Sequence, residues 1–383
     1  MKKYSLTVAC FLLIILPIWG QTKPSKPKRL ALSNEVKIAY TTTGKGDTTL
    51  VFIHGLGGFQ QVWHKTTREL KTRFRCIALD LPGHGLSSTG DYPFTIEFLA
   101  NTVLEFIDSM QLKKVVLVGH SMGGQVVLNA AAKHSPAVKK AVVLAPSGLK
   151  EYSADQKSRM LFWAKPEWTR SRSEFFIRAA FDTLFSDNKL PADAKFMLDY
   201  RLNMKNRPEY FDYFAAMNYK LHKAILDEPV VGLLKNIDIP VLILWGEQDY
   251  LIRPEQAKIA GKLIPENIIQ TFWPCGHLLQ WECAPEVNEA IAQFISPNMQ
   301  VYSTPVALIQ ADQRACIAPC TIRCINKSLN ADHYIWLVND KVVSREKDLV
   351  FTLQKAEGYR ITLIAKKGNQ SDQMEITVRG LGE

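Results

Sequence analysis

A serine between two glycines is the feature of this sequence that points most directly to chemistry. The pattern Gly-His-Ser-Met-Gly-Gly occupies residues 119–124 and follows an apolar run at 115–118. The residues after it, 125–134, are rich in Ala and Val and predict a helix. Strand, sharp turn and helix are the setting of a nucleophile elbow, in which Ser121 carries the attacking hydroxyl. The flanking glycines fit such a turn, because a Cβ atom there would collide with neighbouring backbone.

A carbonyl attacked by Ser121 needs hydrogen-bond donors for the oxygen that becomes negatively charged. The backbone N–H of Met122 is one candidate, because it would open the helix after the turn. A second candidate lies in the glycine-rich loop His-Gly-Leu-Gly-Gly at 54–58, which follows an early apolar strand. We expect the N–H of Leu56 to be that second donor.

An acid and a base follow later in the chain, each just after a predicted strand. Asp249 follows the apolar run at 241–245, and His277 follows the run at 268–272. The carboxyl ends of parallel strands share one edge of a sheet, and sites are built there. The order Ser121, Asp249, His277 therefore predicts a nucleophile, an acid and a base.

Three other polar residues lie near these turns. They are His54, Asp80 and His84, and the last two belong to a Pro- and Gly-rich turn at 80–87. We expect all three to hold loop backbone rather than to react.

These motifs, in this order, resemble the α/β-hydrolase superfamily, in the branch of esterases, lipases and carbon–carbon bond hydrolases with a mobile helical cap. The resemblance runs from about Lys28 to Ile295. It implies an α/β fold with a mostly parallel sheet and a helical cap. Ser121 argues against epoxide hydrolases and haloalkane dehalogenases, which place an aspartate at the elbow. Met122 argues against proline iminopeptidases, which usually carry a bulky aromatic residue there.

The cap is expected at about 150–236, inside a hydrolase domain at 30–298. This stretch lacks strand-like runs and is rich in aromatic residues, which indicates several amphipathic helices whose aromatic stripes mostly pack on one another. We expect a few apolar side chains of the cap to line a pocket over the serine and to set chain-length preference. The candidates are Trp163, Phe181, Tyr213, Met204 and Met217.

A second, all-β domain is expected at 300–383, after the Ser-Pro-Asn boundary at 296–298. Short alternating strands between turn signals predict a small β-sandwich with Trp336 in its core. The pattern resembles the polycystic-kidney-disease-type, immunoglobulin-like repeat of secreted proteins, although Leu-Val-Asn-Asp at 337–340 replaces that family's Gly-Asp-Gly turn. Such modules usually space or bind. A contact with a surface or polymer is the partner that this one suggests.

The amino-terminal residues predict export. Residues 1–20 combine two lysines with a short apolar stretch and read as a signal peptide, and 21–29 form a Lys/Pro-rich linker. Ile18 stands where a small residue is usual before the cleavage point, so an uncleaved membrane anchor is the alternative. Six of the net ten positive charges lie in this leader and linker, so the charge does not indicate a nucleic-acid partner.

The chain has seven cysteines, six of them after the predicted signal peptide, which could form disulfides. Cys275 and Cys283 could close a loop around His277, and Cys316 could pair across a turn with Cys320 or Cys324. Metal binding by the three late cysteines is the alternative, and it is disfavoured because no histidine lies at ligand spacing. We expect no metal and no cofactor.

Together these features predict an exported serine hydrolase, periplasmic or extracellular, that cleaves carboxylic esters with an apolar portion. Its substrate would be a small-molecule or lipid-like ester. Two alternatives stay open. One is a carbon–carbon bond hydrolase that uses the same triad. The other is a catalytically idle hydrolase fold that serves as a binding or surface protein.

Overall fold

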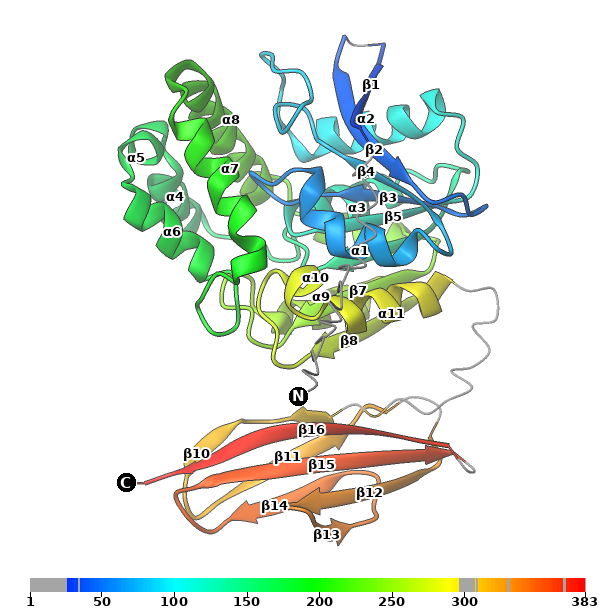
Figure 1. Cartoon of the computed structure of the whole chain (residues 1–383), viewed down its shortest axis with the longest axis vertical. Coiled ribbons are helices and arrows are strands. Elements are labelled where there is room, and N and C mark those ends of the chain that lie inside the picture. The colour runs from blue at the N-terminus through cyan, green and yellow to red at the C-terminus, as the bar shows by residue number, and fades with distance from the viewer. Residues whose placement is uncertain are drawn as a thin grey trace, which may run out of the picture.

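The computed structural model describes residues 26–33, 35–295, 307, 309–328, 331–367 and 370–382. These residues form a larger body of helices and strands and a smaller body of strands (Figure 1). The predicted signal peptide at 1–20, most of the predicted linker at 21–29 and the boundary at 296–298 lie outside the described residues.

The larger body is built on one eight-stranded sheet in the order β1-β2-β4-β3-β5-β6-β7-β8. The strands from β4 onward in that order are parallel, and β1 and β2 are antiparallel, which confirms the predicted mostly parallel sheet. Their bounds are β1 Lys28–Ala31, β2 Lys37–Thr43, β3 Thr49–Ile53, β4 Arg75–Leu79, β5 Val115–His120, β6 Val138–Leu144, β7 Val241–Gly246 and β8 Asn267–Phe272.

The first strand corrects the predicted linker. Lys28 and Arg29, its last two residues, pair with Tyr40 and Ala39 of β2. The side chain of Arg29 also donates from Nε to the carbonyl of Leu86 at 3.2 Å. These hydrogen bonds hold the two residues in the sheet although their composition is that of a linker.

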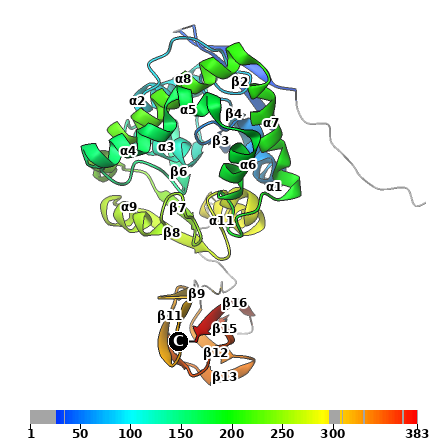
Figure 2. The same ribbon diagram turned by 90° about the vertical axis from the view of Figure 1, so that its left-hand side faces the viewer.

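Helices cover both faces of the sheet. In Figures 1 and 2, α1 and α11 lie on one face, and α2 and α3 lie on the other. Buried strands such as β3 and β5 are apolar at nearly every position because water reaches neither face. The helices are α1 His64–Leu70, α2 Ile96–Ser109, α3 Met122–Ala131, α9 Ala257–Leu263, α10 Leu279–Glu282 and α11 Ala284–Ile295, with short 3₁₀ helices at η1 Gln60–Trp63, η3 Val231–Asn236 and η4 Pro254–Gln256.

A group of helices lies between β6 and β7 and forms the cap, on the left in Figure 1. Ser153 begins the first of them with a capping box in which its hydroxyl and the side chain of Gln156 exchange backbone hydrogen bonds. These helices lie within residues 150–236, where the cap is expected. Its helices are α4 Ala154–Ala164, α5 Pro166–Ser171, α6 Glu174–Asp182, η2 Ala192–Ala194, α7 Lys195–Lys205 and α8 Pro208–Asp227.

The smaller body is an all-β domain of two sheets, in the orders β10-β16-β15-β12-β13 and β14-β11-β9. Trp336 is fully buried in its core and donates from Nε1 to the carbonyl of Glu346 at 3.1 Å. The closer assignment to the polycystic-kidney-disease-type repeat stays a prediction. The strands are β9 Ile309–Ala311, β10 Ala315–Ile317, β11 Cys320–Asn326, β12 His333–Val338, β13 Lys341–Ser344, β14 Leu349–Leu353, β15 Gly358–Lys367 and β16 Gln370–Leu381.

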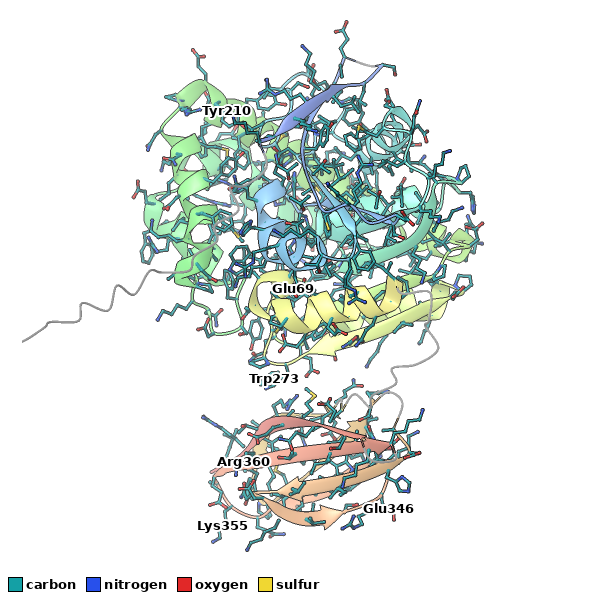
Figure 3. The ribbon with its side chains drawn as sticks, turned by 45° about the vertical axis from the view of Figure 1, so that its right-hand side comes forward. Glu69, Tyr210, Trp273, Glu346, Lys355 and Arg360 are labelled. Carbon is teal, nitrogen blue, oxygen red and sulfur yellow. A yellow bond between two sulfur atoms is a disulfide. The ribbon has the colours of Figure 1, made fainter. Side chains whose placement is uncertain are left out.

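Arg314, just before β10, joins the β domain to the larger body. Its Nη2 donates to Glu247 Oε2 at 3.1 Å, and its guanidinium lies 4.4 Å from the ring centre of Trp273. Figure 3 shows Trp273 on the side of the larger body that faces the β domain. Over the described ranges, no helix has the length and apolarity to cross a membrane, and no group of three or more acidic, His or Cys side chains could hold a metal.

Candidate active site

Ser121 occupies a strained turn between β5 and α3. Its φ is 56° and its ψ is −120°, a left-handed conformation that L-residues adopt rarely. A Cβ atom at Gly119 would lie 2.2 Å from the carbonyl oxygen of Gly123, and one at Gly123 would lie 2.3 Å from that of Ile53. The two glycines therefore make the turn possible, as the sequence predicts. The backbone N–H of Ser121 donates to Leu144 at 2.9 Å, which fixes the turn on the neighbouring strand.

The glycine-rich loop after β3 lies against this turn. A Cβ atom at Gly55 would be only 3.1 Å from the Cβ of Ser121, so the loop backbone approaches the nucleophile closely. The N–H of Gly58 donates to the carbonyl of Gly55 at 3.0 Å and tightens the loop. Leu56 lies between them, and Met122 is the first residue of α3, where backbone N–H groups have no partner within the helix.

Asp249 is buried in the turn after β7 and accepts hydrogen bonds on both carboxylate oxygens. The backbone N–H groups of Leu251 and Ile252 donate to Oδ1, each at 2.9 Å. Trp245 Nε1 reaches Oδ2 at 3.2 Å, and His277 Nδ1 donates to the same oxygen at 2.7 Å. These donors hold the carboxylate in place and aim one oxygen at the imidazole.

His277 is buried beside the elbow. Its Nδ1 carries the proton bonded to Asp249, which leaves the lone pair on Nε2 for another partner. Its ring centre lies 4.7 Å from that of His120, the residue before Ser121, and His120 Nε2 donates to the carbonyl of His277 at 2.9 Å. The structure thus gathers the three residues that the sequence nominates from three separate strands.

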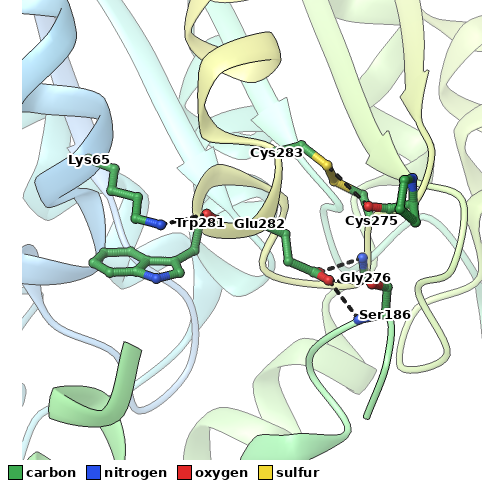
Figure 4. Close-up of a disulfide and its surroundings, with 8 residues drawn as sticks. Lys65, Ser186, Cys275, Gly276, Trp281, Glu282 and Cys283 are labelled. Carbon is green, nitrogen blue, oxygen red and sulfur yellow. Dashed lines mark hydrogen bonds between the residues drawn. A yellow bond between two sulfur atoms is a disulfide. The ribbon is translucent and has the colours of Figure 1, made fainter. Parts of the chain in front are cut away.

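A disulfide and the cap hold the histidine loop in place. Cys275 and Cys283 are bonded (Figure 4). His277 lies within the eight-residue separation that this disulfide closes. The N–H of His277 donates to the carbonyl of Leu184, in the cap, at 2.9 Å. Glu282 accepts from the N–H of Gly276 at 2.7 Å and from that of Ser186 at 2.8 Å.

The second pairing is Cys316 with Cys320, one of the two partners left open by the sequence. Cys324 and Cys76 are free and buried, and burial raises the pKa of each thiol to about 12.

The three polar residues expected to be structural do bind loop backbone. Asp80 accepts from the N–H groups of Gln60 at 2.7 Å and Leu86 at 2.9 Å. His54 accepts the N–H of Leu81 on Nε2 at 3.0 Å, and His84 accepts that of Gly57 at 3.3 Å. Burial lowers the pKa of His54, and it lowers that of His84 to about 3, so both rings are neutral at pH 7.

Arg201 is a site residue that sequence reasoning missed. It extends from α7 and donates from Nη2 to the carbonyl of Gly57, in the loop beside the nucleophile, at 3.1 Å. Its Nε is buried and has no hydrogen-bond partner among the described residues. Burial lowers its pKa to about 10, so it stays charged at neutral pH. No sequence motif around residue 201 predicts this role, because the contact with Gly57 depends on how the cap packs on the sheet.

The apolar residues expected to line a pocket over the serine lie in different places. Tyr213 and Met217 line a cavity of about 380 Å³ between α8 and the loop at 89–94, and Phe181 lines one of about 50 Å³ inside the cap. Ser121, Asp249 and His277 line neither cavity. Met204 packs in the core. Trp163 is 61% exposed, so its expected place in the pocket is wrong, because its helix turns that face outward.

Comparison with known proteins assigns the larger body. Residues 48–284 match the family described as alpha/beta hydrolase fold. The chain is 29% identical over 282 residues to the dihydrolipoyllysine-residue acetyltransferase component of the acetoin cleaving system of Pseudomonas putida, which covers 72% of this chain and 70% of that protein. It is 25% identical over 279 residues to a 2-hydroxy-6-oxononadienedioate/2-hydroxy-6-oxononatrienedioate hydrolase of Comamonas testosteroni, covering 69% of this chain and 93% of that protein.

Among solved structures, a bacterial membrane phospholipase A superposes with a TM-score of 0.60 at 24% identity, covering 70% of this chain and 85% of that one. At that identity the likeness concerns the fold alone.

Proposed function

The chain belongs to the alpha/beta hydrolase fold family, and from this premise we propose that it is an exported serine hydrolase that cleaves carboxylic esters. The observation that carries the proposal is the 2.7 Å hydrogen bond between His277 and Asp249 beside the strained turn of Ser121. Nucleophile, base and orienting acid are the three groups that acyl transfer through a serine requires.

In the proposed reaction, Ser121 Oγ attacks the acyl carbonyl while His277 Nε2 takes its proton. Asp249 stabilises the imidazolium that forms. The N–H groups of Leu56 and Met122 hold the oxyanion. Collapse of the tetrahedral intermediate breaks the bond to the alcohol, which leaves with the proton from His277. Water then attacks the acyl-enzyme by the same route, and the carboxylic acid is released.

Two disulfides support the export part of the proposal. Cys275–Cys283 and Cys316–Cys320 would persist in an oxidising compartment and would be reduced in most cytosols. Cell fractionation with amino-terminal sequencing of the mature protein tests this. Cleavage after Gly20 is expected, and an intact amino terminus in the membrane fraction would favour the anchor instead.

A fluorophosphonate probe tests the nucleophile. It should label the native chain at Ser121, as located by peptide mass spectrometry, and heat-unfolded protein should not react. A panel of p-nitrophenyl esters of increasing acyl length would then define the substrate range. A folded chain that neither reacts with the probe nor cleaves any ester would instead be the idle, binding form of the fold.

Arg201 favours a carbon–carbon bond hydrolase as the second candidate. Its charged guanidinium next to Gly57 could bind a carboxylate of a substrate close to the nucleophile. The Comamonas testosteroni relative is named for a dioate substrate. Spectrophotometric assay of an aromatic ring-fission product beside the ester panel separates the two. Faster turnover of the ring-fission product, lost in Arg201→Gln, would select the second candidate.

A further inference from the structure

The exposed Phe and Trp side chains are concentrated on one part of the cap. Over the residues that the structure describes, every exposed Phe or Trp lies between 162 and 176. We call these five residues the aromatic patch: Phe162 41% exposed, Trp163 61%, Trp168 42%, Phe175 73% and Phe176 63%. A soluble protein rarely leaves rings of this size together in water unless they bind something.

The helices that carry the patch turn their large side chains outward. The buried residues of α4, α5 and α6 are Ala164, Thr169 and Ile177 respectively, while the rings face solvent. A helix that packs only on its own protein would bury the rings and expose the small residues. The rings are therefore open to a contact from outside the described residues.

The five rings form two clusters. Phe162, Trp163 and Trp168 have ring centres 5.3 to 5.7 Å apart, and the rings of Phe175 and Phe176 are 5.6 Å apart. Figure 2 shows the helices that carry the two clusters, α4, α5 and α6, on the side of the larger body that faces the viewer.

Cations accompany the aromatic patch. Residues 154–182 hold six Lys or Arg and four Asp or Glu. Lys165 Nζ lies 5.4 Å from the ring centre of Phe162. Within the described ranges, neither Lys165 nor Arg178 forms an ion pair. Exposed aromatic rings flanked by cations match the interface of an anionic bilayer, where rings enter the headgroup region and cations meet phosphates.

A small cavity lies beneath the aromatic patch. The cavity of about 50 Å³ is lined by Thr169 and Ile177, the inward neighbours of Trp168 and Phe176. Arg201 also lines this cavity, and it contacts Gly57 in the loop beside Ser121. The cavity thus lies between the patch helices and a residue that touches the nucleophile loop.

We propose that the cap docks on anionic phospholipid bilayers through the aromatic patch and presents ester lipids to Ser121. The docking is inferred only from the exposed aromatic patch and its cations, whereas the choice of ester lipid as substrate rests on the proposed function.

Vesicle sedimentation of the full-length Ser121→Ala protein tests docking without turnover. Vesicles of phosphatidylcholine with phosphatidylglycerol should bind it more strongly than phosphatidylcholine alone. Adding Trp163→Ser, Phe175→Ser and Phe176→Ser should lower the partition coefficient by about tenfold or more. The matched control carries Val342→Ser, Val343→Ser and Val350→Ser, which remove exposed apolar side chains from the β domain. Equal binding by the two triple variants would overturn the proposal.

A charge variant gives an independent reading. Lys165→Glu with Arg178→Glu should remove the preference for phosphatidylglycerol, while Lys347→Glu with Lys355→Glu on the β domain should keep it. Light scattering on the same samples reports self-association. If the aromatic triple variant changes a dimer into a monomer but sediments with vesicles as before, the patch is a contact between copies and the bilayer proposal is wrong.

The native-serine protein separates this proposal from the proposed function. Vesicle binding without hydrolysis of any ester would reject the ester hydrolase and keep the docking. Hydrolysis of short soluble esters, with an unchanged ratio of vesicle-lipid to short-ester rates in the aromatic triple variant, would keep the hydrolase and reject the docking. The expected result is a fall of about tenfold in that ratio.

Discussion

The hydrolase body and the β domain both depend on buried sheets, but only the first gathers reactive groups. In the parallel run β3, β5, β6, β7, β8, every strand ends at the same edge, and the turns there hold Leu56, Ser121, Asp249 and His277. In the β domain, β12, β15 and β16 are antiparallel, so successive turns fall at opposite ends. Strand direction, rather than composition, therefore decides where a site can form.

Loss of the nucleophile should show the largest difference between the two bodies. Ser121→Ala should lower kcat for short p-nitrophenyl esters by about 10⁶-fold, because the attacking oxygen is gone while the fold is kept. Ser135→Ala, beyond the other end of α3, is the control and should keep the rate. Measurable residual turnover in a purified Ser121→Ala sample would move the chemistry elsewhere.

The orienting acid should have the next largest effect. Asp249→Asn should cost about 10⁴-fold in kcat, because the amide presents the wrong partner to His277 Nδ1. Glu247→Gln is the matched control two residues away. Its carboxylate accepts from Thr271 at 3.0 Å and from Arg314 at 3.1 Å, so it serves the contact with the β domain. The reverse ranking of these two variants would reassign the acid.

Acid should weaken the hydrolase body before the β domain. Burial lowers the pKa of His84 from 6.5 to about 3 and also lowers that of His120, whereas His333 of the β domain is exposed. Below pH 6.5, His84 binds a proton in the unfolded chain but stays neutral in the folded chain. The free energy of unfolding is therefore highest above pH 6.5 and decreases as the pH falls toward 3. His84 alone should cost about 2 kcal/mol between pH 6.5 and 5.

Urea unfolding at pH 7 and pH 5, followed by Trp fluorescence, measures this loss. His84→Gln keeps a polar side chain and cannot be protonated, so its stability should depend less on pH. An identical pH dependence in the variant would show that His84 carries none of the effect.

The ion pair between Arg314 and Glu247, which joins the two bodies, should contribute little to stability. Arg314 and Glu247 are each about a fifth exposed, and a partly exposed ion pair with a ring contact is worth about 1 kcal/mol. A double-mutant cycle on Arg314→Ala and Glu247→Gln measures that coupling, with Arg360→Ala as a control within the β domain. A coupling near zero would mean that the ion pair does not hold the bodies together.

Removal of the β domain should have the smallest effect on chemistry. A chain ending near residue 298 should cleave short soluble esters within about twofold of the full-length rate, since every proposed triad and oxyanion residue precedes it. A selective loss on polymeric or surface-bound substrates would reveal a targeting role for the domain. A folded but inactive shortened chain would instead show that the contact of Arg314 with the acid and histidine loops is needed for catalysis.

The sequence predicted the parts of this molecule that depend on local rules. The elbow glycines, the buried parallel strands and the order of Ser121, Asp249 and His277 leave direct patterns, because each needs a residue type at a fixed place. The contact of Arg201 and the outward orientation of Trp163 leave no pattern in the sequence. Both depend on how the cap helices are rotated against the core, and that rotation is set by many weak contacts between distant segments.

The position of β16 has a consequence for how the protein is made. This strand lies inside its sheet, with β10 beside it on one edge and β15 on the other. It is also the last strand of the β domain to leave the ribosome. The hydrolase body can therefore fold during translation, while the β domain waits for residues 370–381 before its sheet can close. A truncated message would yield an enzyme whose tail exposes an unpaired strand edge to proteases.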